Sequence, residues 1–335
     1  MSLNIWILSD GKAGHLSQTR GLATALANRL KGHVFELDLS GKGFRAKWSA
    51  VWRACFRLRD ADSGQAGTPT FIIAAGHGMH APLLLAGLLL RKAKTVLCMK
   101  PSFPMSWFDF CVVPRHDLTP ALLANSPAHI ITTLGALHGV HPSPESPKTH
   151  TLILIGGPSK EYGWDETQLL EQLMAVIRGV EVRSQPPSPI GLRRPGRAES
   201  GENFLLTTSR RTPVGFVDAV RQACPSIEVV PVEETPRGWV AEKLEASTAV
   251  WVTRDSVSMI YESLGSGAPV GLLNMPLRSQ DGKKKSRVAR GIEMLEQEGW
   301  VTPFDLWEQS GILKFKGALV EVDRVAELIA STQYS

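Results

Sequence analysis

The stretch AVWVTRDSVSMIYESLGSGAPVGLL, residues 249–273, contains two apolar runs of strand length with a helical pattern between them. Both runs are continuously apolar rather than alternating, which is typical of parallel strands that are covered on both faces of a sheet. The stretch therefore predicts a strand–helix–strand unit. Its first corner is unusually polar for such a buried unit. The polar residues there are Asp255, Ser256, Ser258 and Glu262.

The same alternation of apolar runs and helical patterns extends along the whole chain. In the first half, it predicts strands at residues 4–10, 33–39, 70–76, 94–100, 108–114 and 129–135, and helices at residues 16–30, 44–58 and 79–91. In the second half, it predicts strands at residues 151–157, 203–209, 227–232, 249–253 and 268–273, and helices at residues 165–178, 213–223, 237–246 and 256–265. A capping residue before a proline, Thr212-Pro213, marks one of these helix starts.

The segment HPSPESPKTH, residues 141–150, has the composition of a linker and separates the two halves. We therefore expect an α/β protein with two Rossmann-like domains that face a central cleft, where the carboxyl ends of both sets of strands meet. The expected domains are residues 1–145 and 146–320. Residues 321–335 are expected to form a C-terminal helix that returns to the first domain.

The bulk composition is that of a globular protein. The 335 residues are 43% hydrophobic and 21% charged, which fits two domains of ordinary size. The formal net charge of +5 favours acidic partners without identifying them. The four cysteines are scattered, which suits a reducing compartment better than a disulfide framework. They are Cys55, Cys98, Cys111 and Cys224.

No segment has the pattern of a targeting or membrane-spanning sequence. The start, MSLNIWILSDGKAGH, has no basic leader, and its apolar run is too short for a signal peptide. The longest apolar block, APLLLAGLLLRK, falls below the roughly 18–20 residues that span a bilayer. We expect a soluble protein of the cytoplasm.

The polar corner of the opening stretch predicts a nucleotide site. Free backbone N–H groups and the helix dipole favour a phosphate beside Asp255, Ser256 and Ser258. Glu262 lies one helical turn beyond Ser258 on the same face, within reach of ribose hydroxyls. The alternative is a capped core helix with an incidentally exposed glutamate.

The loop SDGKAGHLSQTRGLA, residues 9–23, follows the first strand. It matches neither the GxGxxG fingerprint nor the GxxxxGK[ST] P-loop, so dinucleotide and P-loop interpretations lose their support. It places Lys12 and His15 at the carboxyl end of a strand, where the histidine could act as a base or orient a phosphate. A helix-capping histidine is the alternative.

Two loops of the second half carry residue types that bind anions. In LIGGPSKEYGWD, residues 154–165, Gly156 and Gly157 permit the close approach of a ligand to the backbone. With LLTTSRRTP, residues 205–213, and the polar corner, three strands of one half are followed by such loops, which indicates a phosphate-bearing ligand. The anion-binding side chains are Ser159, Lys160, Thr208, Ser209 and Arg210.

Other polar clusters are less specific. The HGMH and HGVH pairs, residues 77–80 and 138–141, have a metal-like spacing but no convincing carboxylate companion, so we expect no metal site. Asp117, which follows a strand in CVVPRHD, could orient an acceptor or simply close a loop. The basic stretch DGKKKSRVAR, residues 281–290, could clamp a diphosphate or form a solvated helix start.

Two further segments do not fit the alternating pattern. Residues 181–203 are rich in Pro, Arg, Gly and Ser, and predict a mobile surface insertion, with contact to an anionic surface as the alternative. In the helix predicted within residues 41–60, one stripe is apolar and aromatic and basic residues lie beside it. We expect this stripe to pack on the core, and contact with a membrane interface is the alternative. The stripe consists of Phe44, Trp48, Val51, Trp52 and Cys55.

Six segments resemble the mitochondrial-fission "elongated mitochondria" family, which is known in plants and in many Gram-negative bacteria. They are SDGKAGH, FDFCVVPRHD, TTLGALHGV, LIGGPSKEYGW, LLTTSRRTP and VTRDSVSMIYE. The resemblance spans nearly the whole chain, and the insertion at residues 181–203 is its main departure. The family is in turn similar to two-domain GT-B glycosyltransferases, especially the peptidoglycan enzyme that adds N-acetylglucosamine to a lipid-linked precursor.

This resemblance implies a role for each domain. The second domain would bind a nucleotide-sugar donor, with Glu262 on the ribose and the turn at residues 256–258 on the diphosphate. The first domain would lie on the acceptor side, with His15 facing the acceptor or the transferring sugar. His15 and, from its place after a strand, Asp117 are the catalytic candidates. Its acceptor loop would contain Asp10, Gly11, Lys12 and Gly14, although it lacks the third glycine of the glycosyltransferase pattern.

We therefore expect a metal-independent GT-B glycosyltransferase that moves a sugar from a nucleotide diphosphate to a lipid-linked, lipopolysaccharide or other envelope acceptor. Electrostatic stabilisation of the leaving diphosphate fits the Ser, Thr, Lys and Arg loops. No cofactor and no nucleic-acid partner are expected, and peripheral contact with the inner membrane is left open. Two alternatives remain: a non-catalytic interaction protein with the same fold, and a nucleotide-sugar epimerase.

Overall fold

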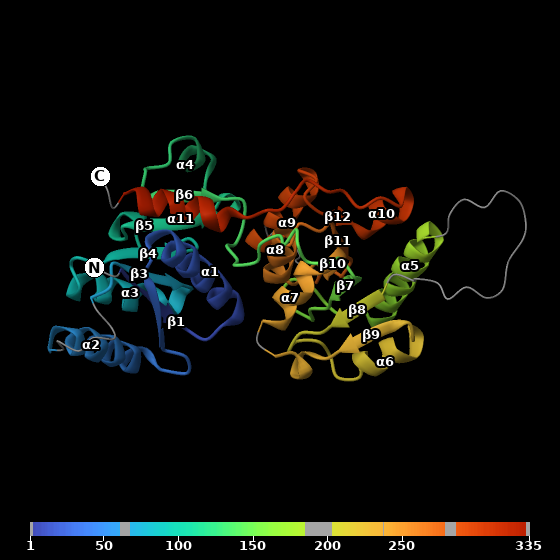
Figure 1. Ribbon diagram of the computed structural model, residues 1–335, viewed down its shortest axis with the longest axis horizontal. Helices are drawn as coiled ribbons and strands as arrows, with labels where there is room; N and C mark the ends of the chain where they lie inside the picture. Colours follow the sequence, from blue (N-terminus) through green and yellow to red (C-terminus); the bar gives the residue numbers. More distant parts are fainter. Residues whose placement is uncertain (1–2, 61–67, 185–202, 237, 279–285, 333–335) are drawn as a thin grey trace, which may run out of the picture. The chain divides into compact units, whose positions relative to one another are not determined.

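The computed structural model describes residues 3–60, 68–184, 203–236, 238–278 and 286–332. The chain forms two compact units (Figure 1). Unit 1 comprises residues 1–139 and 320–335, and unit 2 comprises residues 140–319. Each unit is built on one sheet of six strands. The predicted α/β class with two Rossmann-like sheets is confirmed.

The sheet of unit 1 is parallel and has the order β2-β1-β3-β4-β5-β6. Strand β1 shows why its apolar run is continuous. Ile5 and Ile7 point into the core on one face of the sheet, and Trp6 and Leu8 point into the core on the other. The strands are β1 (Asn4–Ser9), β2 (His33–Asp38), β3 (Phe71–Ala75), β4 (Lys94–Cys98), β5 (Phe110–Pro114) and β6 (Ile130–Thr133).

Helices cover both faces of this sheet. Helices α1 (Ala13–Leu30) and α11 (Glu321–Ser331) pack together on one face. Helices α2 (Phe44–Asp60) and α3 (His80–Leu89) pack on the other. A side-chain oxygen of Glu321 accepts a hydrogen bond from the Leu134 backbone N–H, which ties the C-terminal helix to unit 1. The short helix α4 (Pro120–Ala124) lies between β5 and β6.

The sheet of unit 2 is also parallel, with the order β12-β11-β10-β7-β8-β9. Trp251 of β10 is almost fully buried against Phe304 and Trp307. Its neighbours Val250 and Val252 point to the opposite face and are also fully buried. The strands are β7 (His150–Leu154), β8 (Asn203–Thr207), β9 (Ile227–Val230), β10 (Ser247–Thr253), β11 (Val270–Leu273) and β12 (Thr302–Pro303).

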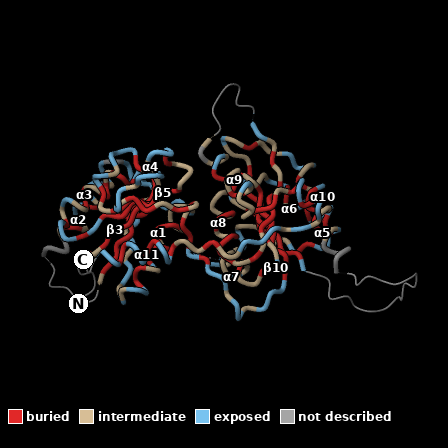
Figure 2. The backbone as a smooth tube through the Cα atoms, turned by 90° about the horizontal axis from the view of Figure 1, so that it is seen from above, coloured by how far each residue is buried: buried red, intermediate tan, exposed pale blue. Residues whose placement is uncertain are grey.

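The helices of unit 2 again cover both faces. Helices α5 (Glu166–Ser184), α6 (Phe216–Ala223) and α10 (Phe304–Ser310) contribute to the core around Trp251. Helices α7 (Trp239–Glu245) and α8 (Val257–Gly265) contact β10, and helix α9 (Arg287–Gln297) precedes β12. Figure 2 shows that buried residues concentrate along the central strands of each unit and exposed residues along the surrounding segments.

Burial also explains the state of the cysteines. All four are buried and free. Burial, together with the neighbouring Cys111, raises the pKa of the Cys98 thiol to about 12. Among the described residues, none of the helices combines the length and the apolar character needed to cross a bilayer.

Two predicted helix starts are wrong. Helix α1 begins at Ala13 rather than at residue 16, so His15 lies in its first turn and not in a flexible loop. Helix α6 begins at Phe216 with Gly215 as its N-cap, not at Pro213. The Thr212 hydroxyl bonds to other loops instead of capping the helix: it accepts a hydrogen bond from the Ser209 N–H at 2.9 Å and donates one to the Gly156 carbonyl oxygen at 2.5 Å.

Some elements were not predicted from the sequence. Strand β12 has two residues, too few for a recognisable pattern. Helices α4 and α10 were also not predicted. Helix α9 begins within residues 281–290, where a helix start was one of the two interpretations. The predicted insertion at residues 181–203, apart from its ends, and the lysines of the basic stretch at residues 281–290 lie outside the described residues.

Candidate functional site

In each sheet, the strand order reverses beside one strand. Strand β1 lies between β2 and β3, and β7 lies between β8 and β10. At such a point, successive crossover connections leave on opposite sides, and ligands of open parallel sheets bind there, outside the carboxyl ends of the strands. The loops after β1 and β3 therefore form the first candidate region, and the loops after β7 and β10 the second.

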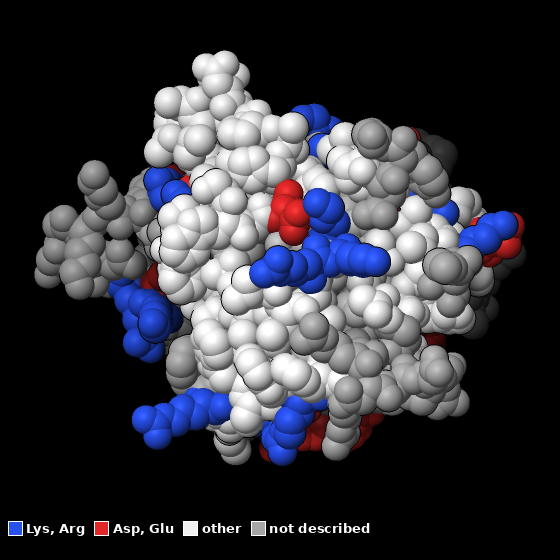
Figure 3. Space-filling model, turned by 90° about the vertical axis from the view of Figure 1, so that its left-hand side faces the viewer, with Lys and Arg blue, Asp and Glu red and all other residues white. Residues whose placement is uncertain are grey.

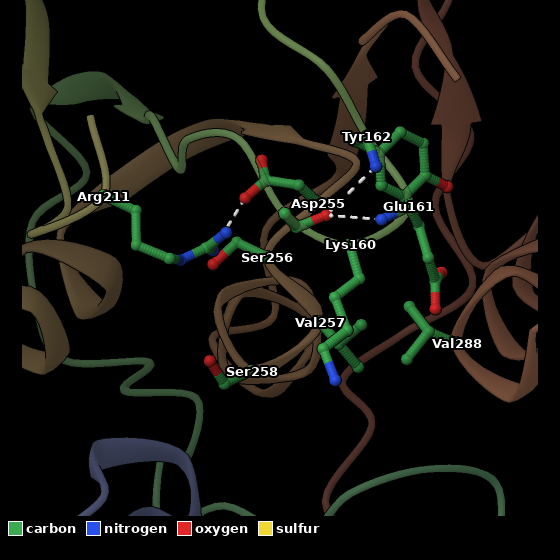
Figure 4. A pocket seen from close by; sticks show the side chains of 10 residues that line it. Lys160, Glu161, Tyr162, Arg211, Asp255, Ser256, Val257, Ser258 and Val288 are labelled. Carbon is green, nitrogen blue, oxygen red and sulfur yellow. Dashed lines mark hydrogen bonds and ion pairs between the residues drawn. The ribbon is translucent and has the colours of Figure 1, made fainter. Parts of the chain in front are cut away.

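The loops after β7, β8 and β10 line an open cavity of about 360 Å³ in unit 2 (Figure 4). This volume is within the range of small-molecule sites in proteins. The lining side chains are mostly polar, and they include two cationic groups. The lining residues are Ser159, Lys160, Glu161, Tyr162, Arg211, Asp255, Ser256, Val257, Ser258 and Val288.

The amino end of α8 forms one wall of this cavity. Ser256 is the N-cap residue, and its side chain makes no capping hydrogen bond. The first intrahelical bond runs from the Ile260 N–H to the Ser256 carbonyl oxygen, so the amides of residues 257–259 precede it. These amides and the positive end of the helix dipole favour an anion. Figure 4 shows Lys160 running alongside Val257 at this helix end.

Behind this wall, Asp255 ties the surrounding loops together. Its carboxylate is enclosed, and Oδ2 lies 2.7 Å from Nη2 of Arg211. The same oxygen accepts a hydrogen bond from the Gly157 N–H at 3.0 Å. Nη1 of Arg211 donates to the Gly157 carbonyl oxygen at 3.0 Å. Asp255, predicted to lie beside a phosphate, thus supports the loops and the guanidinium that lines the cavity.

This arrangement explains both glycines after β7. A Cβ at Gly156 would lie 2.3 Å from the Asp255 carboxylate oxygens, and a Cβ at Gly157 would lie 2.1 Å from the Arg211 carbonyl oxygen. Such distances are far inside van der Waals contact. The glycines are therefore required by the chain's own packing, whereas their predicted role was to admit a ligand.

The predicted serines also shape the loops. The Ser159 hydroxyl accepts hydrogen bonds from the backbone N–H groups of Glu161 at 3.2 Å and Tyr162 at 3.1 Å. The Ser209 hydroxyl accepts one from the Arg211 N–H at 3.2 Å. Each serine thus orients the basic or acidic residue that follows it. Ser159 lines the cavity, while Ser209 is not among the described lining residues.

The structure distinguishes neighbouring candidates. Arg211 lines the cavity, whereas the predicted Arg210 is exposed and is not among the described lining residues. Thr208 is buried, and its hydroxyl accepts a hydrogen bond from the Val232 N–H at 3.1 Å. Glu262 is half-buried and is likewise absent from the described lining.

Glu161 was not predicted from the sequence, yet it lines the cavity. Its Oε2 atom is buried and has no hydrogen-bond partner among the described residues. A buried carboxylate oxygen normally accepts at least one hydrogen bond. The only sequence signal was its place beside Lys160 in the loop after β7.

In unit 1, the loop after β1 forms a histidine–aspartate pair. Nδ1 of His15 lies 2.9 Å from Oδ2 and 3.0 Å from Oδ1 of Asp10. Because a carboxylate only accepts hydrogen bonds, this contact places the proton on Nδ1 and leaves Nε2 of the neutral ring as an acceptor. The Asp10 side chain is 8% exposed and that of His15 is 20% exposed. This is the arrangement that orients a general base.

The surrounding loop fixes the pair. Lys12 is the N-cap of α1, its N–H donates to Asp10 at 3.2 Å, and its Nζ lies 3.8 Å from Asp10 Oδ2. Gly11 has a φ of +77°, and Gly14 lies in the first turn of α1. At the end of β3, a Cβ on Gly76 would lie 2.3 Å from the His15 ring. The histidine therefore packs against the backbone at the point where the strand order reverses.

Asp117 lies elsewhere along the same edge, in the turn after β5. It is half-buried, and its carbonyl oxygen accepts a hydrogen bond from Nζ of Lys100 at 3.1 Å. Strands β3 and β4 separate β1 from β5, so their ends are about 14 Å apart at the usual strand spacing. His15 and Asp117, the two predicted catalytic candidates, therefore follow strands that are not neighbours in the sheet.

Comparisons with known proteins agree with the two-sheet architecture. The chain is similar to an uncharacterized protein of Rickettsia prowazekii, with 21% identity over an alignment 319 residues long that covers 82% of this chain and 84% of that protein. It is similar in structure to the UDP-GlcNAc 2-epimerase from Neisseria meningitidis bound to UDP-GlcNAc, with a TM-score of 0.50, 10% identity and 100% of both chains covered. It is also similar to MurG from Acinetobacter baumannii, with a TM-score of 0.50, 12% identity, and 98% and 99% of the two chains covered. At these identities the likeness establishes the fold, which is GT-B-like.

The family model of mitochondrial fission ELM1 matches residues 13–185 and 193–332. These ranges include the helix that carries His15, the loops around the unit 2 cavity and helix α11. The chain belongs to the mitochondrial fission ELM1 family.

Proposed function

We propose that the protein binds a nucleotide-diphosphate sugar in the unit 2 cavity and transfers its sugar to an acceptor hydroxyl, without a metal ion. The observation that carries this proposal is the meeting of the α8 amino end with Lys160 and Arg211 at the reversal point of the unit 2 sheet. Backbone amides, serine hydroxyls and two cations are the groups that hold a diphosphate. The same fold in a structure bound to UDP-GlcNAc supports the ligand class.

In the proposed reaction, the acceptor oxygen bonds to the anomeric carbon as the bond from that carbon to the diphosphate oxygen breaks. Negative charge develops on the departing diphosphate, where the α8 amides and the Lys160 ammonium stabilise it. The acceptor proton goes to Nε2 of His15, and Asp10 stabilises the resulting imidazolium. An envelope glycolipid or polysaccharide is the acceptor class we propose.

Glu161 extends this proposal to the hydroxyls of the ligand. A carboxylate is an acceptor of hydrogen bonds only, so a buried oxygen without a partner needs a donor from the ligand, and sugar and ribose hydroxyls are such donors. Glu161 lines the cavity beside Lys160, and its Oε2 meets these conditions within the described residues. We propose that Glu161 binds a sugar or ribose hydroxyl there. The resemblance to glycosyltransferases instead favours Glu262 for the ribose.

A thermal-shift measurement with UDP, UDP-GlcNAc and other sugar nucleotides tests the donor site. A ligand at 100 times its dissociation constant stabilises the folded state by about 2.7 kcal/mol. Lys160→Met and Ser258→Ala should weaken binding, while Lys243→Met, a lysine of α7 outside the cavity lining, should not. Loss of affinity in Glu161→Gln but not in Glu262→Gln would assign the hydroxyl contact to Glu161. Stabilisation by none of the sugar nucleotides would refute the donor site.

A second candidate, an epimerase, follows from the likeness to UDP-GlcNAc 2-epimerases. The two activities differ in their need for an acceptor. An epimerase converts UDP-GlcNAc into its C2 epimer with no acceptor present, whereas a transferase releases UDP only when an acceptor hydroxyl or water attacks the sugar. Nuclear magnetic resonance of the sugar nucleotide after incubation separates them. Binding of sugar nucleotides without any turnover, with and without envelope extract, would favour the non-catalytic alternative.

A further inference from the structure

Helix α2 has a buried row and an exposed row of large side chains. Val51 and Cys55 are 0% and 1% exposed and pack on the unit 1 core. Trp48 and Trp52, one turn apart on an adjacent row, are 37% and 47% exposed. Only part of the predicted stripe is therefore buried: Val51 and Cys55 pack on the core, whereas Trp48 and Trp52 remain exposed. The side chain of Phe44, also predicted in the stripe, lies outside the described residues.

The exposed tryptophan row forms an ordered aromatic surface. The Trp52 ring stacks on the Phe56 ring with centroids 4.7 Å apart and an interplanar angle of 26°. Arg45 and Arg53 are exposed on the same side of the helix. Nε of Arg53 donates to the Ser49 carbonyl oxygen at 3.2 Å. We call these five residues the α2 surface: Arg45, Trp48, Trp52, Arg53 and Phe56.

The charge of this segment has one sign. Between Asp38 and Asp60, the sequence has six basic residues and no acidic residue. They are Lys42, Arg45, Lys47, Arg53, Arg57 and Arg59. Figure 3 shows the end of the molecule where α2 lies in Figure 1, with Lys and Arg side chains set in a largely uncharged surface. A basic, aromatic helix face is complementary to an anionic and partly apolar surface.

The charge also argues against a second copy of this chain as the occupant, because two α2 surfaces would bring their basic groups together. Tryptophan rings favour the interface between water and hydrocarbon, where their apolar body and indole N–H are both accommodated. Basic side chains around them are attracted to anionic headgroups. A helix anchored by its Val51–Cys55 row can present both groups outward while unit 1 stays folded.

We propose that the α2 surface docks unit 1 onto an anionic lipid bilayer, with Trp48 and Trp52 at the headgroup boundary and Arg45 and Arg53 on the lipid phosphates. The contact is interfacial: the helix lies along the membrane surface and does not enter the hydrocarbon. This inference does not depend on the sugar-transfer proposal, since no residue of the α2 surface takes part in it.

Co-sedimentation of the full-length protein with lipid vesicles tests this inference. The protein should bind vesicles that contain phosphatidylglycerol, bind pure phosphatidylcholine vesicles much more weakly, and dissociate as salt is raised. Trp48→Ser/Trp52→Ser should weaken binding by at least about tenfold, because both apolar anchors are lost. Arg45→Glu/Arg53→Glu should weaken it by a similar factor through charge alone, which keeps the inference testable if the tryptophan variant misfolds.

Two matched controls use exposed residues elsewhere. Leu328→Ser changes a leucine of α11 that is 43% exposed, on the opposite face of the unit 1 sheet. Arg221→Glu changes an exposed arginine of unit 2. Both should bind vesicles as the unmodified protein does. Equal binding by the tryptophan double variant would overturn the inference. Failure of the unmodified protein to bind anionic vesicles would also overturn it. The same conclusion would hold if the tryptophans instead mediated self-association or binding to single-stranded DNA.

Discussion

Nη2 of Arg211 lies 2.7 Å from Oδ2 of Asp255, and this contact joins the loop after β8 to the loop after β10. The Asp255 carboxylate is enclosed, while the Arg211 side chain is 41% exposed and lines the cavity. A buried acid thus positions a cation that remains accessible to a ligand. The pair connects residues 44 positions apart in the sequence, and it also holds the loop after β7 through the Gly157 N–H.

Replacing Asp255 should destabilise unit 2. Asp255→Ala leaves Nη2 of Arg211 and the Gly157 N–H without the carboxylate oxygen that they share. We expect the free energy of unfolding to fall by about 1–3 kcal/mol, less than for a fully buried pair because Arg211 is partly solvated. Urea unfolding measures this change. Asp218→Ala serves as the control, since its carboxylate is 85% exposed and 3.8 Å from Arg221. An equally small effect at both positions would contradict the supporting role of Asp255.

Gly157, in the loop after β7, should not tolerate replacement by alanine. In Gly157→Ala, the Cβ would lie 2.1 Å from the Arg211 carbonyl oxygen and 2.3 Å from its carbonyl carbon. Backbone atoms cannot rotate away, so we expect a loss of about 1–3 kcal/mol in unfolding free energy. Gly43→Ala is the matched control, because a Cβ there would meet nothing within 4 Å. Thermal unfolding should show a lower midpoint for the first variant only.

The orientation of His15 should depend on the charge of Asp10. In Asp10→Asn, the amide can donate a hydrogen bond to Nδ1 and so favour the other tautomer, which has no lone pair on Nε2. If His15 is the base of a sugar transfer, kcat should fall by about 10²–10⁴-fold while donor affinity stays unchanged. Steady-state kinetics and donor titration check this. A fall in donor affinity with kcat unchanged would show that His15 is not the catalytic base.

Burial of His80 should make stability depend on pH. Burial, together with the positive charge of the nearby His77, lowers the pKa of His80 from 6.5 to about 4. The unfolded chain therefore binds this proton first as pH falls. The contribution of His80 to stability is complete above pH 6.5 and is lost as pH falls through about 4.

The variant His80→Asn tests this dependence, because asparagine does not titrate and its amide oxygen can accept the hydrogen bond from the Ser102 N–H, which lies 3.3 Å from Nδ1 of His80. Between pH 7 and pH 4, the unmodified protein should lose up to about 3 kcal/mol more than this variant, at about 1.4 kcal/mol for each pKa unit. Urea unfolding at several pH values measures the difference. If the unfolding free energies of the two proteins changed with pH in parallel, titratable groups other than His80 would be responsible for the pH dependence.

The repeating elements could be predicted because their signal is local. Strand β1 has its side chains buried on both faces, so its apolar run is unbroken in the sequence. The same holds for β7 and β11, which are also buried throughout. Strand β12 has only two residues and gave no such signal. The loops at the carboxyl ends of the strands could also be located, because each loop begins where an apolar run ends in the sequence.

The pairing of side chains within those loops could not be predicted. Arg210 and Arg211 are adjacent and chemically identical, and only Arg211 meets Asp255. Thr212 and Pro213 have the pattern of a helix start, but the Thr212 hydroxyl donates a hydrogen bond to the carbonyl oxygen of Gly156, 56 residues away. The split of the α2 stripe has the same origin, because the width of the core decides which row of the helix is covered.

The sequence by itself determined the alternation of strands and helices and the polar character of the loops that end the strands, because both follow from which side chains are apolar within a few residues of one another. Tertiary structure alone decided that Asp255 is enclosed, that Arg211 and Glu161 line the cavity, and that Asp10 holds His15. Those outcomes depend on which loops become neighbours when strands distant in sequence pair, and burial then fixes the partners that each charge and each polar group must find.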